Sequence, residues 1–542
     1  MNVSELIVKI LENEGVDTIF GIPGEENVTF MEALYKSHIR YIQTADERGA
    51  AFMAASYGRL REKPGVVFTT LGPGALNIPN GVSFANMAGI PLIALTWQRG
   101  IIQSNKDNGF MYVDIKKVLK PIVKYQSTIS SSKDVINTIQ KSFLISKTPS
   151  QGSCHIEIPE DIGKQQVKED IILKKPVVIK SKKINLPDIN KAGDIISSSK
   201  TPLILIGFNA SNNQVARLIR DFSQKADIHV ITTPMAQGML PSDHPLSLYS
   251  LIHTSDTLLQ KYLNSVDTII SIGYNPIEFS PRFFNSNKSK NIIHINSVNA
   301  KIHPNYTPQI EIIGKIDEAL ELLIERVDKK EGSSIVLNEL KEKLIKKRNH
   351  DYAYPIKPEY LVNMLKRVSR NAIIVHDNGM HKLWVTKFFR PDNPNQIILD
   401  NALASMGSGV PNGISTKLMY PEKDVIVNTG EGGLLMCLGE ISTAISLDIA
   451  IVILVWRDGG YGMINWHQKS NNLHSFGVTV KSPDFVKFIE SFGGVGYRIN
   501  NAKELEGVLI KALNNNKLTI IDCPVDYSEN IKVFNKNNYE ED

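Results

Sequence analysis

The sequence predicts an α/β protein made of three doubly wound domains, each built on a parallel sheet. The first observation behind this is that short apolar, β-branched runs alternate with helical patterns along most of the chain. The second is that polar, lysine-rich stretches separate three such regions within 542 residues, a length that suits about three domains. The predicted domains are 1–165, 186–328 and 350–535.

The first domain alternates strand-like runs with helical patterns. Strands that are joined through helices form βαβ units, in which the strands are parallel. The predicted strands are VDTIF (16–20), YIQT (41–44), GVVFTT (65–70) and PLIALTW (91–97), and the predicted helices cover 25–37, 49–61 and 79–88. A lysine-rich, proline-containing connector is expected at 169–188.

The second and third domains repeat this rhythm and are separated by a charged helical connector at about 328–350. In the second domain the predicted strands are PLILIG (202–207), HVITT (229–233), VDTIISIG (266–273) and NIIHIN (291–296), with helices at 213–226 and 315–327. In the third domain the predicted strands lie within NAIIVHDNG (371–379), DVIVNTGEGG (424–433), IAIVILVW (449–456) and LTIIDCPVDY (518–527).

The composition excludes several classes of partner. The net charge is only +5, and the excess lysines are scattered, which is typical of a solvated surface and not of a nucleic-acid interface. The longest apolar run, 449–456, is too short to cross a membrane, and residues 1–20 predict a helix and a strand, not a signal peptide. Cys154, Cys437 and Cys523 show no CxxC spacing. We therefore expect a cytoplasmic protein with no nucleic-acid or membrane partner.

Two acidic residues, Glu431 and Asp458, each follow an apolar strand of the third domain and stand 27 positions apart. The carboxyl ends of parallel strands meet at the same edge of a sheet, so the two side chains are expected to lie together. Both are flanked by glycines that expose the backbone, and Glu431 precedes a helical pattern. Such a pair suits a divalent cation that holds a diphosphate.

Two features of the first domain suggest a second part of the same site. Glu47 ends a strand and begins a helix of small residues. It is either an acid that favours the helix dipole or a partly buried carboxylate that hydrogen-bonds a heterocycle nitrogen. The Gly-Pro-Gly turn in LGPGALN (71–77) lets the backbone approach a ligand closely.

Taken together, these motifs resemble thiamine-diphosphate-dependent enzymes of the acetolactate synthase type, within the 2-oxo-acid decarboxylase and acetohydroxyacid synthase superfamily. The resemblance extends over essentially the whole chain, in the order of the family. Its landmarks are GIPGEEN (21–27), ADERGAAFMAASYGRL (45–60), TLGPGALN (70–77), HDNGMHKLW (376–384), ASMGSGVPNGI (404–414) and the segment 430–468. It implies that the three domains are pyrimidine-binding, central and diphosphate-binding.

The resemblance implies a role for each matching residue. Glu47 would bond the aminopyrimidine ring and promote the tautomer whose nitrogen removes the thiazolium C2 proton. Met406 would hold the cofactor in its bent shape. Mg²⁺ would be bound by Glu431, Asp458 and the carbonyl of Gly460. Further cofactor contacts would come from Pro23, Gly24, Gly72, Pro73, Gly74, Asn77, Gly379, Met380, His381, Ser405, Gly407, Gly430, Gly432, Gly433, Tyr461, Gly462 and Met463.

The chain departs from the family in its metal turn. Glu431 stands where relatives carry aspartate, and the extra methylene lengthens the side chain by about 1.5 Å, while Mg²⁺ tolerates little distortion. The backbone would retreat, a water would intervene, or affinity would fall. Arg457 replaces a small polar residue, and it is expected either to point to solvent or to bond Glu431.

A second departure concerns the loop that meets the substrate. Relatives carry a glutamine after histidine or phenylalanine, whereas NGFMYVD (108–114) supplies Phe110 and Met111. We expect these two residues, with Gln98, to act on the substrate in a more apolar pocket. Arg99 is either a carboxylate-binding residue or a surface arginine. Trp466 and His467 are expected to pack near the acceptor pocket.

The resemblance also implies partners and cofactors. In this family the pyrimidine end of the cofactor binds one subunit and the diphosphate end another, so we expect a homodimer or homotetramer with active sites at the subunit interface. The cofactors expected are thiamine diphosphate and Mg²⁺. The segment GYNPIEFSPRFFN (273–285) is closer to the FAD-free, catabolic branch, which argues against a flavin.

The implied reaction is decarboxylation of a 2-oxo acid such as pyruvate, followed by carboligation to a second carbonyl compound. With pyruvate on both sides the product is 2-acetolactate. One alternative is a simple 2-oxo-acid decarboxylase, or a carboligase with another acceptor. A second alternative is a catalytically weak paralogue with a binding role, suggested by the altered metal turn.

Overall fold

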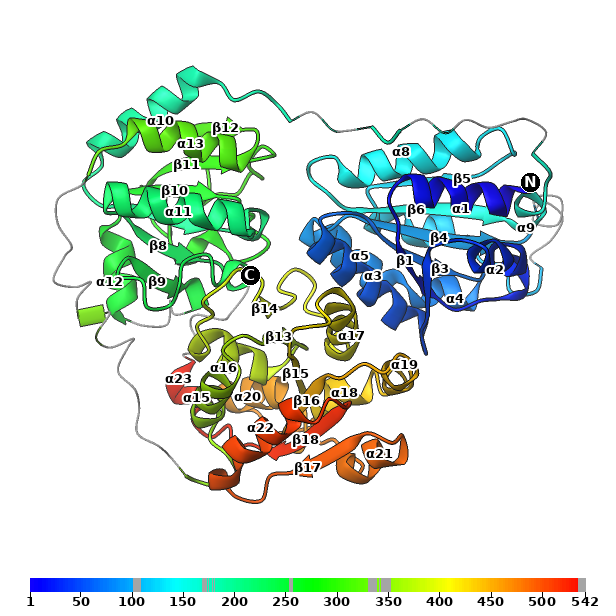
Figure 1. Cartoon of the computed structure of the whole chain (residues 1–542). Coiled ribbons are helices and arrows are strands. Elements are labelled where there is room, and N and C mark those ends of the chain that lie inside the picture. The colour runs from blue at the N-terminus through cyan, green and yellow to red at the C-terminus, as the bar shows by residue number, and fades with distance from the viewer. Residues whose placement is uncertain are drawn as a thin grey trace.

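The computed structural model describes residues 1–100, 109–167, 181–252, 257–329 and 352–534, with single residues and short pieces of the two connectors at 173, 175–177, 179, 339, 340 and 342. It contains three six-stranded sheets, each flanked by helices (Figure 1). The strand pairings within all three sheets are parallel. The predicted fold class is therefore confirmed. Most of the predicted connector 328–350 and part of 169–188 lie outside the described residues.

The N-terminal sheet has the strand order β2-β1-β3-β4-β6-β5. Its strands are β1 (Thr18–Gly21), β2 (Arg40–Gln43), β3 (Gly65–Thr69), β4 (Leu92–Gln98), β5 (Tyr125–Thr128) and β6 (Ser153–Pro159). The helices are α1 (Val3–Asn13), α2 (Val28–Tyr35), α3 (Glu47–Arg61), α4 (Pro73–Asn77), α5 (Pro79–Ala88), α7 (Ile115–Leu119), α8 (Val135–Lys147) and α9 (Glu160–Gly163).

The central sheet has the order β12-β11-β10-β7-β8-β9, so its direction of winding changes between β7 and β10. Its strands are β7 (Pro202–Ile206), β8 (His229–Thr232), β9 (Ser247–Ser250), β10 (Thr268–Ile272), β11 (Asn291–Asn296) and β12 (Ile310–Ile313). The helices are α10 (Leu186–Ser198), α11 (Asn213–Ala226), α12 (Thr257–Ser265) and α13 (Ile316–Arg326).

The C-terminal sheet has the order β14-β13-β15-β16-β18-β17. Its strands are β13 (Ile373–His376), β14 (Ile397–Ile398), β15 (Val425–Gly430), β16 (Val452–Arg457), β17 (Val495–Arg498) and β18 (Thr519–Pro524). The helices are α15 (Pro358–Val368), α16 (Met380–Phe388), α17 (Gly409–Met419), α18 (Glu431–Leu435), α19 (Glu440–Ser446), α20 (Gly462–Ser470), α21 (Phe485–Ser491), α22 (Leu505–Asn514) and α23 (Asn530–Val533).

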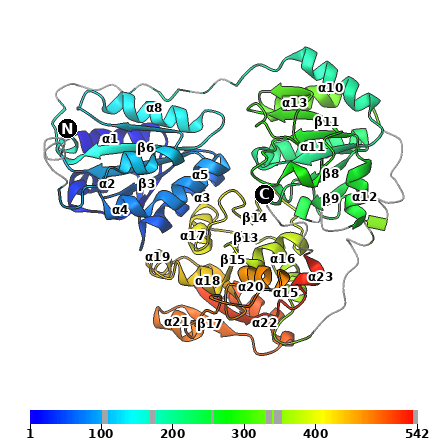
Figure 2. The same ribbon diagram turned by 180° about the vertical axis from the view of Figure 1, so that it is seen from behind.

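The N-terminal and central domains both lie against the C-terminal domain, as the front and back views agree (Figures 1 and 2). Helix α3 packs on α17 across the first of these contacts. The side chains of α3 from Ala50 to Ala55 are four alanines, Phe52 and Met53, and they share one buried hydrophobic cluster with Trp384 and Val427 of the C-terminal domain. The helix that begins at Glu47 is therefore anchored on the domain that carries the acidic pair.

Candidate cofactor and metal site

A cavity of about 240 Å³ opens at the carboxyl ends of β13, β15 and β16. This is the edge of a doubly wound sheet where ligands usually bind. Among the described residues, every one that lines it belongs to the C-terminal domain: Asn378, Gly379, Met380, His381, Lys382, Ala404, Met406, Gly430, Gly432, Gly433, Trp456, Asp458, Gly460, Tyr461, Gly462, Met463, Ile464 and Tyr527.

The acidic pair meets as the sequence predicts. Gly430 pairs with Trp456 in the ladder between β15 and β16, which brings the next turns together. The Glu431 carboxylate is fully buried and accepts the backbone N–H of Gly459 at 2.6 Å and that of Asp458 at 3.4 Å. The longer side chain thus reaches across to the second acidic turn.

The electrostatics of this pair favour a cation. Burial, and then the neighbouring Glu431 carboxylate, raise the pKa of Asp458 to about 7. Burial also raises the pKa of Glu431. A buried and a half-buried carboxyl group that oppose each other's ionisation gain most from a bound positive charge. No group of three His, Cys, Asp or Glu side chains in the described part of the chain could hold a metal ion, so a third protein ligand would be a carbonyl such as that of Gly460, which also lines the cavity.

The glycine-rich turn after β15 leaves room for the Tyr461 ring to form one wall of the cavity. A Cβ at Gly432 would lie 2.6 Å from the Tyr461 ring and 3.4 Å from the Met406 methyl group. Glycine therefore lets the Tyr461 ring close over this turn, whereas Met406 would stay at ordinary contact distance from a larger residue. Met406, predicted to be the residue beneath the cofactor, does line the cavity beside the diphosphate turn.

Asp377 organises the loop that carries Met406. Its buried carboxylate accepts the backbone N–H of Gly407 at 2.9 Å and of Gly409 at 3.1 Å. Burial raises its pKa to about 6. The neighbouring His381 donates from Nε2 to the Asp377 carbonyl at 3.1 Å, and burial lowers its pKa to about 3, so that the imidazole is neutral. Gly379 and His381 of this motif are among the predicted cofactor contacts, but Asp377 is not.

Glu47 lies in a second cluster, on the N-terminal domain. It is 8% exposed, and its Oε2 accepts the Asn77 side-chain amide at 2.9 Å. A Cβ at Gly74 would stand 2.9 Å from Glu47 Oε1. The predicted Gly-Pro-Gly turn is therefore in contact with Glu47. None of these residues lines the 240 Å³ cavity.

The predicted substrate residues lie next to this second cluster. A Cβ at Gly72 would overlap the Met111 carbonyl, so the 110–111 loop lies directly on the turn. Phe110 is 78% exposed, with the Arg99 guanidinium 5.9 Å from its ring centroid. Gln98 is buried, and its side-chain amide donates to the Val113 carbonyl at 3.0 Å. Gln98 thus supports the loop, and residues 101–108 lie outside the described part of the chain.

Pro23 and Gly24 follow the carboxyl end of β1, at the same edge of the sheet as the Gly-Pro-Gly turn that follows β3. A Cβ at Gly24 would overlap the side chain of Thr70, which lies two residues before Gly72 of the Gly-Pro-Gly turn. Ser405 of the C-terminal domain donates to the Asn80 side chain at 2.9 Å. It contacts the N-terminal domain and does not line the cavity, unlike its neighbour Met406.

Arg457 makes neither of the two predicted arrangements, in which it points to solvent or bonds Glu431. Its Nε donates to Asp522 at 2.6 Å, and Asp522 also accepts Arg498 Nε at 3.0 Å. The register of β16 and β18 places these side chains together, so Arg457 neither points freely to solvent nor bonds Glu431. Trp466 is buried and packs with its ring centroid 4.8 Å from that of His467, as expected of packing residues.

Several residues that line the cavity are not among those predicted from the sequence, above all Tyr527 and Ile464. Tyr527 comes from the segment after β18, and no local motif marks it. Burial and the carboxyl groups of Asp458 and Glu431 raise the pKa of its phenol well above the usual value. Ile464 follows Met463 on α20 and is half exposed at the mouth.

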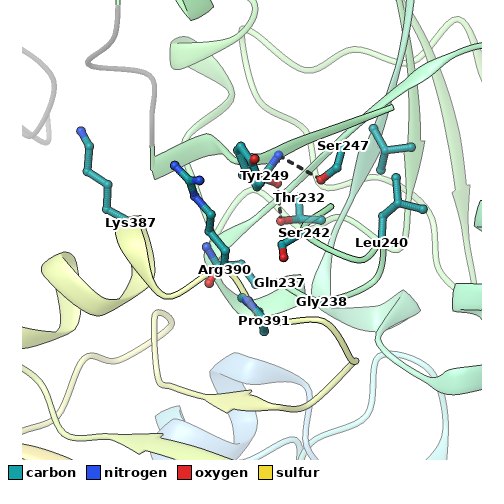
Figure 3. Close-up of a pocket in the computed structure, with 11 residues that line it drawn as sticks. Thr232, Gln237, Gly238, Leu240, Ser242, Ser247, Tyr249, Lys387, Arg390 and Pro391 are labelled. Atoms are coloured by element: carbon teal, nitrogen blue, oxygen red, sulfur yellow. Dashed lines mark hydrogen bonds between the residues drawn. The ribbon is translucent and has the colours of Figure 1, made fainter. Parts of the chain in front are cut away.

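A second, smaller pocket lies between the central and C-terminal domains (Figure 3). Its volume of about 20 Å³ suits about one water molecule. The Arg390 guanidinium lies 4.3 Å from the Tyr249 ring centroid on one wall. The Gln237 side chain donates to the Thr386 carbonyl at 2.6 Å on another. This pocket is too small to be the principal ligand site.

Among the described residues, no helix combines the length and hydropathy that a membrane span requires.

The chain matches three family models. Residues 1–119 match the N-terminal TPP-binding domain of thiamine pyrophosphate enzymes, residues 189–323 the central domain, and residues 377–523 the C-terminal TPP-binding domain.

Full-length relatives agree with these matches. The chain is 30% identical to the acetolactate synthase of Bacillus subtilis (strain 168), over 98% of this chain and 94% of the relative. It is 31% identical to a probable acetolactate synthase large subunit of Methanococcus aeolicus, over 97% and 92%. It is 26% identical to a catabolic acetolactate synthase of Raoultella terrigena, over 97% and 95%. The chain therefore belongs to the thiamine-pyrophosphate-dependent enzymes of the acetolactate synthase type.

Proposed function

We propose that this enzyme uses thiamine diphosphate and Mg²⁺ to decarboxylate pyruvate or a similar 2-oxo acid, and joins the two-carbon unit to a second carbonyl compound. With pyruvate as donor and acceptor the product is 2-acetolactate. The observation that carries the proposal is the pairing of buried Glu431 with half-buried Asp458 at the glycine-rich edge of a ligand-sized cavity. When bound, the cofactor would supply a carbon nucleophile and an electron sink.

Different residues of the chain would bind the metal, the diphosphate and the aminopyrimidine ring. Glu431, Asp458 and the Gly460 carbonyl would hold Mg²⁺, and the N–H groups of Gly432 and Gly433 would face the diphosphate. Glu47 would hold the proton at the aminopyrimidine nitrogen, and Asn77 orients its carboxylate from the side.

The cavity walls would position the cofactor and exclude water. Met406 would support the cofactor from below, and Met380, Trp456 and Met463 add apolar surface to the wall. Removing water from such a site strengthens the electrostatic interactions inside it. The Phe110–Met111 loop would meet the substrate from the N-terminal side.

We further propose a homodimer, or a tetramer of two dimers, with each active site between subunits. The support is that the cavity draws its described walls from the C-terminal domain alone, while Glu47 and Asn77 lie on the N-terminal domain outside it. A complete site then needs the N-terminal domain of a second copy.

We propose that no flavin binds the central domain. Ligands of doubly wound sheets bind where the winding direction changes, here between β7 and β10. The Glu278 carboxylate fills that position: it accepts the N–H of Phe208 at 2.8 Å, that of Asn275 at 3.1 Å and the Thr233 hydroxyl at 2.7 Å. A phosphate would have to displace this carboxylate from the same donors.

Product analysis tests the proposal. Protein supplied with pyruvate, thiamine diphosphate and Mg²⁺ should form 2-acetolactate, and omission of either cofactor should abolish its formation. Acetaldehyde as the main product would favour the second candidate, a simple decarboxylase, for which the apolar Phe110–Met111 loop is the supporting observation. Absence of cofactor binding up to millimolar concentration would favour a paralogue with a binding role.

A further inference from the structure

The start of helix α3, at Glu47, is held by a carboxylate from the C-terminal domain of the same chain. Glu440 begins α19 and is 1% exposed. Its Oε1 accepts the backbone N–H of Asp46 at 3.2 Å, and its Oε2 accepts the Thr443 hydroxyl at 2.7 Å. The Thr443 oxygen in turn accepts the backbone N–H of Ala45 at 3.1 Å. Both amides directly before Glu47 are thus bonded to α19.

A glycine in the first turn of α3 makes this contact possible. A Cβ at Gly49 would overlap the Glu440 carboxylate, so any larger residue would push that group away. Next to it, the Arg48 guanidinium donates to the Met436 carbonyl, at the end of α18. The first turn of α3 is therefore fixed from two sides by the segment that follows the metal turn.

Burying the Glu440 carboxylate in this interface costs free energy. Burial raises the pKa of Glu440 to about 7, so its charged form is disfavoured. A neutral side chain would fill the same space without that cost. The carboxylate adds two acceptor atoms at fixed positions, one on Asp46 and one on Thr443.

We propose that Glu440 is a positioning residue that sets the place of Glu47 through the Asp46 amide and the Thr443–Ala45 bridge. This inference rests on the function proposed above, in which the Glu47 carboxylate bonds the aminopyrimidine. Displacing a catalytic group by about 1 Å can lower a rate by about 100-fold. Glu440 does not line the cavity, so its loss should slow proton transfer without weakening the diphosphate and metal contacts.

Three variants test the proposal. Glu440→Ala removes both acceptors, Glu440→Gln keeps the shape and at least one acceptor, and Thr443→Val removes the bridge to Ala45. Ser415→Ala is the matched control, since Ser415 of α17 also bonds α3 across the interface, donating to the Met53 carbonyl at 2.9 Å, but further along the helix. The readouts are the C2-proton exchange rate of the bound cofactor, the cofactor dissociation constant with Mg²⁺, and amide hydrogen exchange at 45–49 without cofactor.

We expect Glu440→Ala to slow C2-proton exchange at least tenfold, with the dissociation constant within about threefold of the original. Amide exchange at 45 and 46 should quicken, Glu440→Gln should recover part of the C2 rate, and Ser415→Ala should match the unmodified protein. An unchanged C2 rate in Glu440→Ala overturns the proposal. If that variant does not fold, Thr443→Val must slow C2 exchange, or the proposal is wrong.

Two further results distinguish a failure of the proposed function from a failure of the positioning role of Glu440. If the unmodified protein catalyses no C2 exchange, the proposed function fails. If it does, and Glu47→Gln abolishes exchange while Glu440→Ala retains it, only the positioning role fails.

Discussion

The Glu431 carboxylate accepts the backbone N–H of Gly459 at 2.6 Å, so the two acidic turns of the metal site are bonded directly to each other. An aspartate would be shorter by about 1.5 Å. The length of the glutamate therefore has a structural consequence of its own, because it lets the first acidic turn bond the second without a cation.

Glu431→Asp should distinguish the effect of the Glu431–Gly459 hydrogen bond on stability from the effect of the carboxylate on metal binding. Losing one hydrogen bond to a charged acceptor should lower the free energy of unfolding of the cofactor-free protein by about 1.5–3 kcal/mol. The carboxylate remains next to Asp458, so Mg²⁺ affinity should stay within about threefold. Chemical denaturation and calorimetric titration measure the two effects, and a loss of Mg²⁺ affinity beyond tenfold would show that the longer acid is itself required by the cation.

The Arg457–Asp522–Arg498 cluster predicts a non-additive pair of substitutions. Asp522 is 3% exposed, whereas the arginines are 34% and 40% exposed, so either arginine alone keeps the buried carboxylate paired. Arg457→Ala and Arg498→Ala should each cost about 1 kcal/mol or less. The double variant should cost about 3 kcal/mol or more, because it leaves a buried charge without a partner. Denaturant titration of the four proteins gives the coupling, and simple additivity would contradict it.

Glu278 should make stability depend on pH. Burial raises the pKa of Glu278 to about 7, above its unfolded value near 4.5. The folded state then binds more protons between these values, so the contribution of Glu278 is complete below about pH 4.5 and is lost as the pH rises through about 7. Glu278→Gln should flatten this fall in the free energy of unfolding. Equal slopes between pH 5 and 7 in both proteins would show that Glu278 does not titrate there.

A mixed dimer tests the shared active site. Glu47→Gln disables one half of a site and Asp458→Ala the other, so each variant alone should be inactive. Co-expressed chains should form dimers in which one of the two sites is intact, with about half the activity of an unmodified dimer. Purification by two different affinity tags isolates the mixed species. A mixed dimer as inactive as its parents would place both halves in one chain.

The sequence predicted the parts of the site that local chemistry marks. Strands β15 and β16 are strongly apolar and end in acidic, glycine-rich turns, so the meeting of Glu431 and Asp458 followed from parallel pairing. Tyr527 and Glu440 could not be found in this way, because their roles depend on which segments pack together in three dimensions. Similarly, the two-residue strand β14 carries too little periodicity to be recognised.

The partner of Arg457 could not be predicted from the sequence for the same reason. Its position beside Asp458 suggested a role at the metal turn. Its partner, Asp522, is set by the pairing of β16 with β18, more than 60 residues apart in the chain. Sequence neighbours predict ion pairs along a helix, whereas this pair depends on strand register.

The most direct measurement is the release of labelled carbon dioxide from [1-¹³C]pyruvate by the protein and by its Glu47→Gln variant, each with thiamine diphosphate and Mg²⁺. Glu47→Gln removes the carboxylate but keeps the size of the side chain and the Asn77 contact. We expect rapid release by the unmodified protein and at least a 100-fold slower release by the variant, at similar cofactor affinity. Equal release by the two proteins would contradict this expectation.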